Sequence, residues 1–149
     1  LSNAQLAKEI RPFLEDGYGY LPRAEGWLER VAAVIRADLY TFEDAIEAAE
    51  WVFEDDLFYD TDALQSPQAR AIVTRLVAEL AQLVVLDEKT AVSILNALYK
   101  AHPKTPPAAI DAPIYAALTG SPKEPPIPKI LGIIGKQRAL IRLGKALHN

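Results

Sequence analysis

Apolar residues recur at three- and four-residue steps along most of the chain, which is the spacing of amphipathic helices. A first helix over 5–14 would carry Leu6, Ile10, Phe13 and Leu14 on one face, with Pro12 expected to bend or shorten it. Pro22 stands where the first residue of a second helix is expected. That helix has the clearest periodicity, and its apolar face consists of Trp27, Leu28, Val31, Ala32, Val34, Ile35 and Leu39.

Capping residues mark the starts of the next three predicted helices. Thr41 is a typical N-cap for a helix over 41–53, and acidic residues follow it in the first turn. Ser66-Pro67 pairs an N-cap with a proline at the first helical position, and this helix is expected to run to about Val85. Asp87 caps another. The expected buried residues of the three are Phe42, Ala45, Ile46, Ala49, Val52 and Phe53; Ile72, Val73, Leu76, Val77, Leu80, Leu83 and Val84; and Ala91, Ile94, Leu95, Leu98 and Tyr99.

The C-terminal third is divided by prolines, eight of the eleven lying between Pro103 and Pro128. Apolar residues such as Ile110, Ile114 and Ile127 still need burial, so this stretch predicts short helices and turns. Gly132-Ile-Ile-Gly135 has the spacing of a KH-domain loop but lacks the α/β setting, and a tight helix–helix junction is expected instead. No run alternates with the two-residue period of a strand. The expected fold class is all-α.

An aspartate-rich segment over 54–65 interrupts the helical periodicity. We interpret it as the joint between two subdomains, 5–62 and 63–149. Asp55, Asp56, Asp60 and Asp62 could together bind a divalent cation, but the segment lacks the glycine and closing glutamate of a calcium loop. A solvated linker is the favoured interpretation.

Composition excludes several classes of site. Half of the residues are hydrophobic and 24% are charged, which is typical of a globular chain. There is no cysteine, so disulfides and thiolate metal sites are excluded. No apolar run approaches the ~20 residues of a membrane span. No histidine is paired with a plausible nucleophile and no glycine-rich phosphate loop occurs, so nothing predicts catalysis.

Charge is divided unevenly between the two predicted subdomains. Residues 1–62 carry 15 acidic and 5 basic side chains, a net charge of −10, and residues 63–149 carry 5 acidic and 11 basic, a net charge of +6. One half could therefore meet a polyanion, or the two halves could attract one another.

A basic stripe on the last helix is the best candidate for binding chemistry. Arg138, Arg142 and Lys145 follow four- and three-residue steps and share a face, opposite the leucines of that helix. Lys129, Lys136 and, on the proline turn, Lys123 belong to the same end of the chain. Such a stripe can follow phosphates, although it can equally be an ordinary solvated face.

The chain from about Gln5 to Leu147 resembles the C-terminal part of bacterial-type glutamyl-tRNA synthetases. The resemblance rests on the order and spacing of four segments: LAKEIRPFLED, WLERVAAVIR, TFEDAIEAAEWVFEDD and a final block running from AALTG to GKQRAL. It implies an all-helical cage of two subdomains that reads tRNA anticodon bases. The family's catalytic His-x-Gly-His and Lys-x-Ser-Lys motifs do not occur in this sequence. Residues 1–4 lack an initiator methionine and are interpreted as the remnant of a cleaved tag.

The resemblance also implies site residues. In the family the turn after AALTG approaches the anticodon, which points to Glu124, Pro125 and Ile127. Tyr115 stands where the family often has a basic residue, and its ring could stack on a base.

A second implied position lies in the first subdomain. Arg36-Ala37-Asp38 corresponds to a family Arg-x-Arg pattern whose second arginine inspects the third anticodon base in discriminating enzymes. An aspartate cannot make the bidentate contact of an arginine. The parent enzyme is therefore hypothesised to be non-discriminating, or to read that base with other residues.

The resemblance makes glutamate tRNA, and hypothetically glutamine tRNA, the expected partner. It implies a monomer, no cofactor in this stretch, ATP and magnesium in the catalytic domain of the same parent chain, no membrane, and a location in the cytoplasm or an organelle of bacterial descent. Two alternatives stay open. One is a helical protein-interaction module that docks through Pro125-Pro126-Ile127-Pro128, and the other is a small hydrolase that uses the aspartate-rich joint.

Overall fold

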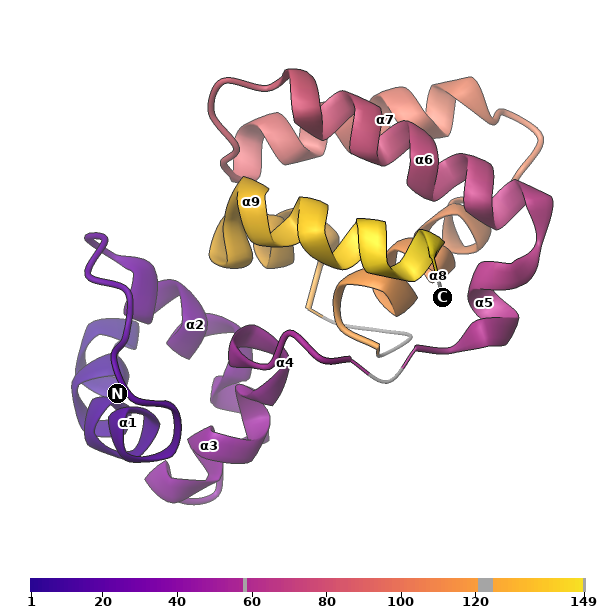
Figure 1. The fold of residues 1–149 in the computed structure, drawn as a ribbon. Helices are drawn as coiled ribbons and strands as arrows, with labels where there is room; N and C mark the ends of the chain where they lie inside the picture. The colour runs from indigo at the N-terminus through magenta and orange to yellow at the C-terminus, as the bar shows by residue number, and fades with distance from the viewer. Residues whose placement is uncertain (58, 121–124, 149) are drawn as a thin grey trace. The chain divides into compact units, whose positions relative to one another are not determined.

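The computed structural model describes residues 1–57, 59–120 and 125–148 (Figure 1). These residues form α-helices and two short 3-10 helices, and no strand occurs among them, so the all-α prediction is confirmed. The chain divides into two compact units, an N-terminal unit of Leu1–Glu54 and a C-terminal unit of Asp55–Asn149. The C-terminal unit therefore begins at Asp55, whereas the sequence interpretation placed the boundary between residues 62 and 63.

The N-terminal unit is built on the pairing of its two longest helices, which contact one another along the predicted apolar faces. Tyr18 stacks on Phe53 with ring centroids 4.4 Å apart, and Trp27 meets the same ring edge-on. The hydroxyl of Tyr18 donates a hydrogen bond to the carbonyl of Ile46, which ties the end of the first helix to the third. The elements are α1 (Asn3–Tyr18), α2 (Trp27–Ile35), η1 (Arg36–Asp38), η2 (Phe42–Asp44), α3 (Ala45–Ala48) and α4 (Glu50–Phe53).

Three sequence predictions for the N-terminal unit are wrong in detail. The first helix ends at Tyr18 rather than at Leu14, and Pro12 lies inside it without shortening it. Pro22 begins no helix, and α2 starts at Trp27 after Gly26, whose φ of 76° is left-handed. The expected helix over 41–53 is interrupted where Ala49 adopts φ −98° and ψ 9°.

The segment at Thr41 shows both a confirmed cap and a misplaced core residue. The Asp44 carboxylate accepts hydrogen bonds from the backbone N–H groups of Tyr40 and Thr41, closing a capping box. This box starts a 3-10 turn rather than an α-helix, so Phe42 does not reach the core. Its side chain is 37% exposed.

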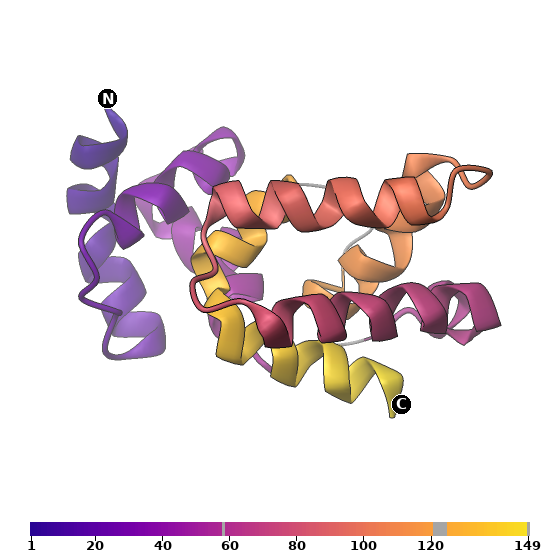
Figure 2. The ribbon, with the colours of Figure 1, turned by 90° about the horizontal axis from the view of Figure 1, so that it is seen from above.

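The C-terminal unit is organised around its last helix, which contacts three others (Figure 2). Helices α6 and α7 lie side by side, joined by a short loop, and α9 packs against both and against α8. The helices are α5 (Thr61–Gln65), α6 (Pro67–Gln82), α7 (Glu88–Ala101), α8 (Pro107–Leu118) and α9 (Ile127–Leu147). Their fully buried large side chains include Ile72, Leu76, Leu80, Leu98, Ile110, Ile114, Leu118 and Ile130.

The predicted caps of α6 and α7 are confirmed. The backbone N–H of Ala69 donates to the Ser66 hydroxyl at 3.0 Å, and Thr90 and Asp87 form a reciprocal capping box. Helix α6 ends at Gln82, a few residues earlier than expected. Val84 therefore lies in the connecting loop and is 96% exposed, so its predicted burial is wrong.

Gly135 divides α9 into two helical segments. It adopts φ 81° and ψ 167°, a conformation essentially restricted to glycine. The expected helix–helix junction at Gly132–Gly135 is thus present, and its second glycine is the residue that changes the direction of the chain.

Candidate nucleic-acid interface

The predicted basic stripe on α9 is not a free cationic face. Arg142 is completely buried, with 0% of its side chain exposed. Its Nη2 lies 3.0 Å from Oδ1 of Asp55, and its Nη1 donates to the carbonyl of Leu118 at 2.7 Å. Arg138 donates to the same Asp55 oxygen at 2.8 Å. The interpretation of Arg142 as an exposed phosphate ligand is therefore wrong, since its guanidinium is held inside the C-terminal unit.

We call Asp55, Arg138 and Arg142 the Asp55 cluster. Burial would raise the pKa of Asp55, but the hydrogen bonds and charges of the two arginines outweigh it and hold this pKa below its usual value. Burial also lowers the pKa of Arg142, against the opposing effect of Asp55. Asp55 is 47% exposed and Arg138 30% exposed, so one side of the cluster faces solvent. Asp55 is thus a structural counter-ion rather than a solvated linker residue.

The remaining lysines near α9 have partners of different strength. Lys136 donates to the carbonyls of Leu83 at 2.6 Å and Ala81 at 3.3 Å, where its charge neutralises the end of α6. Lys129 pairs with Glu88 at 3.2 Å, and both side chains are about half exposed. Lys145 lies 3.6 Å from Asp56, which is 93% exposed. The last two pairs are open to water, so a phosphate can replace their carboxylates.

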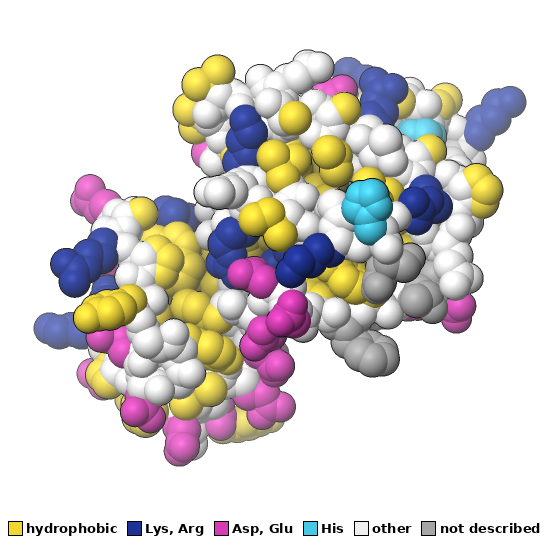
Figure 3. Space-filling view, viewed as in Figure 1, with side chains coloured by type: hydrophobic (Ala, Val, Ile, Leu, Met, Phe, Trp, Pro, Cys, Tyr) yellow, Lys and Arg dark blue, Asp and Glu magenta, His cyan; other side chains and the backbone are white. Residues whose placement is uncertain are grey.

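The surface view agrees with this distribution. Figure 3 shows the Lys and Arg side chains of the C-terminal unit spaced apart between apolar and neutral surface, not gathered into one stripe. Acidic side chains are frequent over the N-terminal unit. On this face of the molecule, the positive charge of the C-terminal unit is therefore dispersed.

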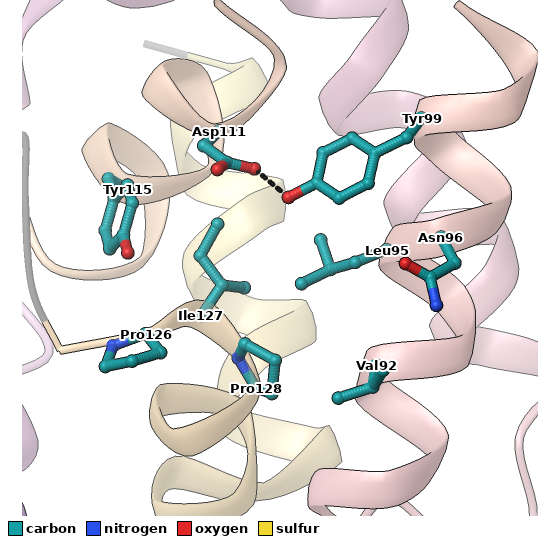
Figure 4. A pocket seen from close by; sticks show the side chains of 9 residues that line it. All are labelled: Val92, Leu95, Asn96, Tyr99, Asp111, Tyr115, Pro126, Ile127 and Pro128. Atoms are coloured by element: carbon teal, nitrogen blue, oxygen red, sulfur yellow. Dashed lines mark hydrogen bonds between the residues drawn. The ribbon is translucent and has the colours of Figure 1, made fainter. Parts of the chain in front are cut away.

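A pocket of about 240 Å³ opens between α7, α8 and the start of α9 (Figure 4). Two of the predicted site residues, Tyr115 and Ile127, line it together. Pro125 immediately precedes Pro126, which caps α9 and also lines the pocket. The full lining is Val92, Leu95, Asn96, Tyr99, Asp111, Tyr115, Pro126, Ile127 and Pro128.

One end of this pocket is polar and the other is apolar. The hydroxyl of Tyr99 donates to Oδ1 of Asp111 at 2.6 Å, joining α7 to α8. Burial and this hydrogen bond raise the pKa of the Tyr99 hydroxyl, so it remains a donor at neutral pH. Pro128 and Val92 lie at the opposite, apolar end of the pocket, and the side chain of Ile127 lies between the polar end and the apolar end. The pocket thus offers an apolar floor with a carboxylate at its edge.

The other predicted site residues lie elsewhere. Arg36 and Asp38 belong to η1 in the N-terminal unit, where Arg36 donates to Oδ1 of Asn3 at 2.5 Å and to the carbonyl of Leu1 at 2.6 Å. Both η1 side chains are exposed. Lys123 and Glu124 lie outside the described residues.

Sequence reasoning missed Asp55, Tyr99 and Asp111. Asp55 had a visible signal in the aspartate-rich joint but no visible partner, because its arginines are 83 and 87 residues away. Tyr99 was predicted to face inward, and nothing in the local sequence connects it to Asp111 twelve residues later.

Two further features of the described chain concern metals and membranes. No group of three or more His, Asp or Glu residues in residues 1–57, 59–120 and 125–148 is placed to hold a metal ion. Within the same ranges, every helix falls short of the length and apolar character that crossing a bilayer requires.

The comparisons with known proteins agree on one family. A family model described as "Anticodon binding domain" matches residues 5–147. Glutamate–tRNA ligase from Thermus thermophilus is 29% identical over 150 residues, which are 99% of this chain and 31% of that protein. Glutamate–tRNA ligase from Exiguobacterium sibiricum is 30% identical over 139 residues, 89% of this chain and 29% of that protein.

Solved structures show the same fold. A glutamate tRNA ligase from Elizabethkingia meningosepticum superposes with a TM-score of 0.86 at 17% identity, covering 100% of this chain and 30% of that chain. Glutamate-tRNA synthetase from Elizabethkingia anophelis gives a TM-score of 0.82, also at 17% identity. The chain thus spans about 30% of the length of these relatives. It belongs to the anticodon-binding domain family, and it resembles the C-terminal anticodon-binding region of glutamate–tRNA ligases.

Proposed function

We propose that this chain is the anticodon-binding part of a glutamate–tRNA ligase and that its partner is the anticodon loop of glutamate tRNA. The observation that carries the proposal is the family match over residues 5–147. The pocket beside the Pro125–Pro128 turn supports it, because Tyr115 and Ile127 offer an aromatic and apolar surface for an unstacked base.

Phosphate contacts would come from the exposed lysines of the C-terminal unit. Lys129 follows Pro128 at the pocket and is held only by an exposed pair with Glu88, so exchange for a phosphate costs little. Lys145 is similarly placed against Asp56. Arg142 is not among these contacts, because its charge is already matched by Asp55 within the fold.

The remaining parts of the proposal follow from the parent enzyme. ATP and magnesium would be used by a catalytic domain that this stretch does not contain, so the chain alone would bind tRNA without charging it. A monomer in the cytoplasm, or in an organelle of bacterial descent, is the expected setting.

Binding of this chain to glutamate tRNA and to the same tRNA with a scrambled anticodon tests the proposal. With two or three phosphates neutralised on a single-stranded loop, the affinity should fall about tenfold between 50 and 200 mM salt. Lys129→Ala should weaken binding to both RNAs, and Lys8→Ala, an exposed lysine of α1, serves as the matched control. Equal binding of the two tRNAs would overturn anticodon reading. Binding to a protein partner with an affinity that does not change with salt would favour the protein-interaction module.

We further propose that the parent enzyme is non-discriminating and also accepts glutamine tRNA. Asp38 supports this proposal, because it is an exposed acidic residue at the position where an arginine would inspect the third anticodon base. The test is to compare glutamylation of the two tRNAs by the full-length enzyme. Comparable rates are expected, and a clear preference for glutamate tRNA would contradict the proposal.

A further inference from the structure

We propose that the pocket between α7, α8 and the start of α9 holds a single splayed-out nucleobase, and that the Asp111 carboxylate selects a base that presents an amino group to it. This inference rests on the proposed function and names the part of the RNA that the pocket takes. It assigns Asp111 a role in specificity and Tyr99 the role of positioning it.

The volume of the pocket suits a ligand as small as one base. Its volume of about 240 Å³ lies below the ~300–1,000 Å³ of pockets for larger organic ligands. Ile127, which is 2% exposed, lies in the middle of the pocket, with Tyr115 on the α8 side and Pro126 near it (Figure 4). A base lying over Ile127 would have the ring of Tyr115 within reach for stacking, which contributes to binding whatever the base.

Selectivity comes from the polar end. An ionised carboxylate only accepts hydrogen bonds, and the Tyr99 hydroxyl already donates to Oδ1 of Asp111. The remaining acceptor capacity of Asp111 matches the N4 amino group of cytosine, whereas the O4 carbonyl of uracil would meet it with like partial charge. Cytosine and uracil have nearly the same size and stacking surface. The pocket should therefore separate them by hydrogen bonding alone.

The placement of Asp111 favours this role over a purely structural one. Asp111 and Tyr115 are four residues apart on α8, so they share the face that borders the pocket. Tyr99 is held by its place in α7 and fixes the carboxylate from the side. A structural tie between α7 and α8 would need only this hydrogen bond, and would predict no effect of Asp111 on the choice of base.

The test uses RNA hairpins with the anticodon loop of glutamate tRNA. Three pairs are made, each pair differing only in cytosine or uracil at one anticodon position, and binding of the intact chain is measured by fluorescence anisotropy. At one position we expect about a tenfold preference for cytosine, the size of one good base contact. Asp111→Asn should reduce that preference to less than about twofold, since an amide can rotate to donate or accept.

Two further variants separate specificity from folding. Tyr99→Phe keeps the ring and the Asp111 carboxylate but removes the hydrogen bond that positions this carboxylate, so the cytosine preference should fall to a value between those of the wild type and Asp111→Asn. Glu9→Gln removes the same charge from an exposed position on α1 and should leave the preference unchanged.

The outcomes distinguish this inference from the proposed function. If the chain prefers the native loop over a scrambled one but Asp111→Asn retains the cytosine preference, or no position prefers cytosine, the role of Asp111 is refuted and anticodon reading stands. If the chain does not distinguish any of the loops, both are refuted.

Discussion

Replacing Asp55 by alanine should destabilise the C-terminal unit far more than the same change at its neighbour. Arg142 has 0% of its side chain exposed, and Asp55 is the carboxylate that lies 3.0 Å from its guanidinium. Removing the carboxylate leaves a buried cation with less compensation, a loss that in fully buried pairs costs about 3–5 kcal/mol. Asp55 is itself 47% exposed, so water will replace part of the lost interaction. We expect a loss of about 2 kcal/mol.

The assay is thermal unfolding followed by calorimetry and by circular dichroism. For a unit of this length, 2 kcal/mol corresponds to a fall in Tm of about 8–16 °C. Both tryptophans lie in the N-terminal unit, so tryptophan fluorescence gives a separate record of that unit.

Asp56→Ala is the matched control. Asp56 is 93% exposed and lies 3.6 Å from Lys145, so its loss should change the stability by less than about 0.5 kcal/mol. Equal, small effects of the two substitutions would refute the structural role of the Asp55 cluster and would restore the solvated-linker interpretation.

Two other predictions concern pH and the backbone. The pKa of Asp55 is lowered in the folded state. Its contribution to the free energy of unfolding is therefore present above about pH 4 and is lost as the pH falls through the folded-state pKa. Urea unfolding at pH 7 and pH 3 should show that the difference in stability between the wild type and Asp55→Ala is smaller at pH 3. Gly135→Ala should destabilise by about 1–3 kcal/mol through backbone strain alone, because an added Cβ would meet nothing within 4 Å. Gly144 also has open space around it but lies in helical geometry, so Gly144→Ala should instead stabilise the protein by about 0.5–1 kcal/mol. Changes in stability of the same sign and size for the two substitutions would contradict the role of backbone strain at Gly135.

The fold was predictable where the controlling interaction is local. Ser66 and Asp87 cap their helices through groups three residues away, and the face of α2 follows from its three- and four-residue steps. The break at Ala49 was not predictable, because alanine favours a helix and only the packing of the N-terminal unit can override that preference.

The candidate site was predictable in part. Tyr115 and Ile127 could be identified by resemblance, and the structure brings them into one pocket. Helical spacing places Arg138 and Arg142 on neighbouring turns but cannot tell a solvated face from one that meets a carboxylate 87 residues earlier in the chain. The burial of Arg142 is a property of the tertiary fold and has no local signal.

The most direct test of the central claim is the affinity of this chain for glutamate tRNA relative to the same tRNA with only its anticodon scrambled, measured at 50 mM and 200 mM salt. We expect tighter binding of the native anticodon at both concentrations, with both affinities falling as salt rises because phosphates are contacted. Binding that is the same for the two RNAs, or that does not change with salt, would contradict it.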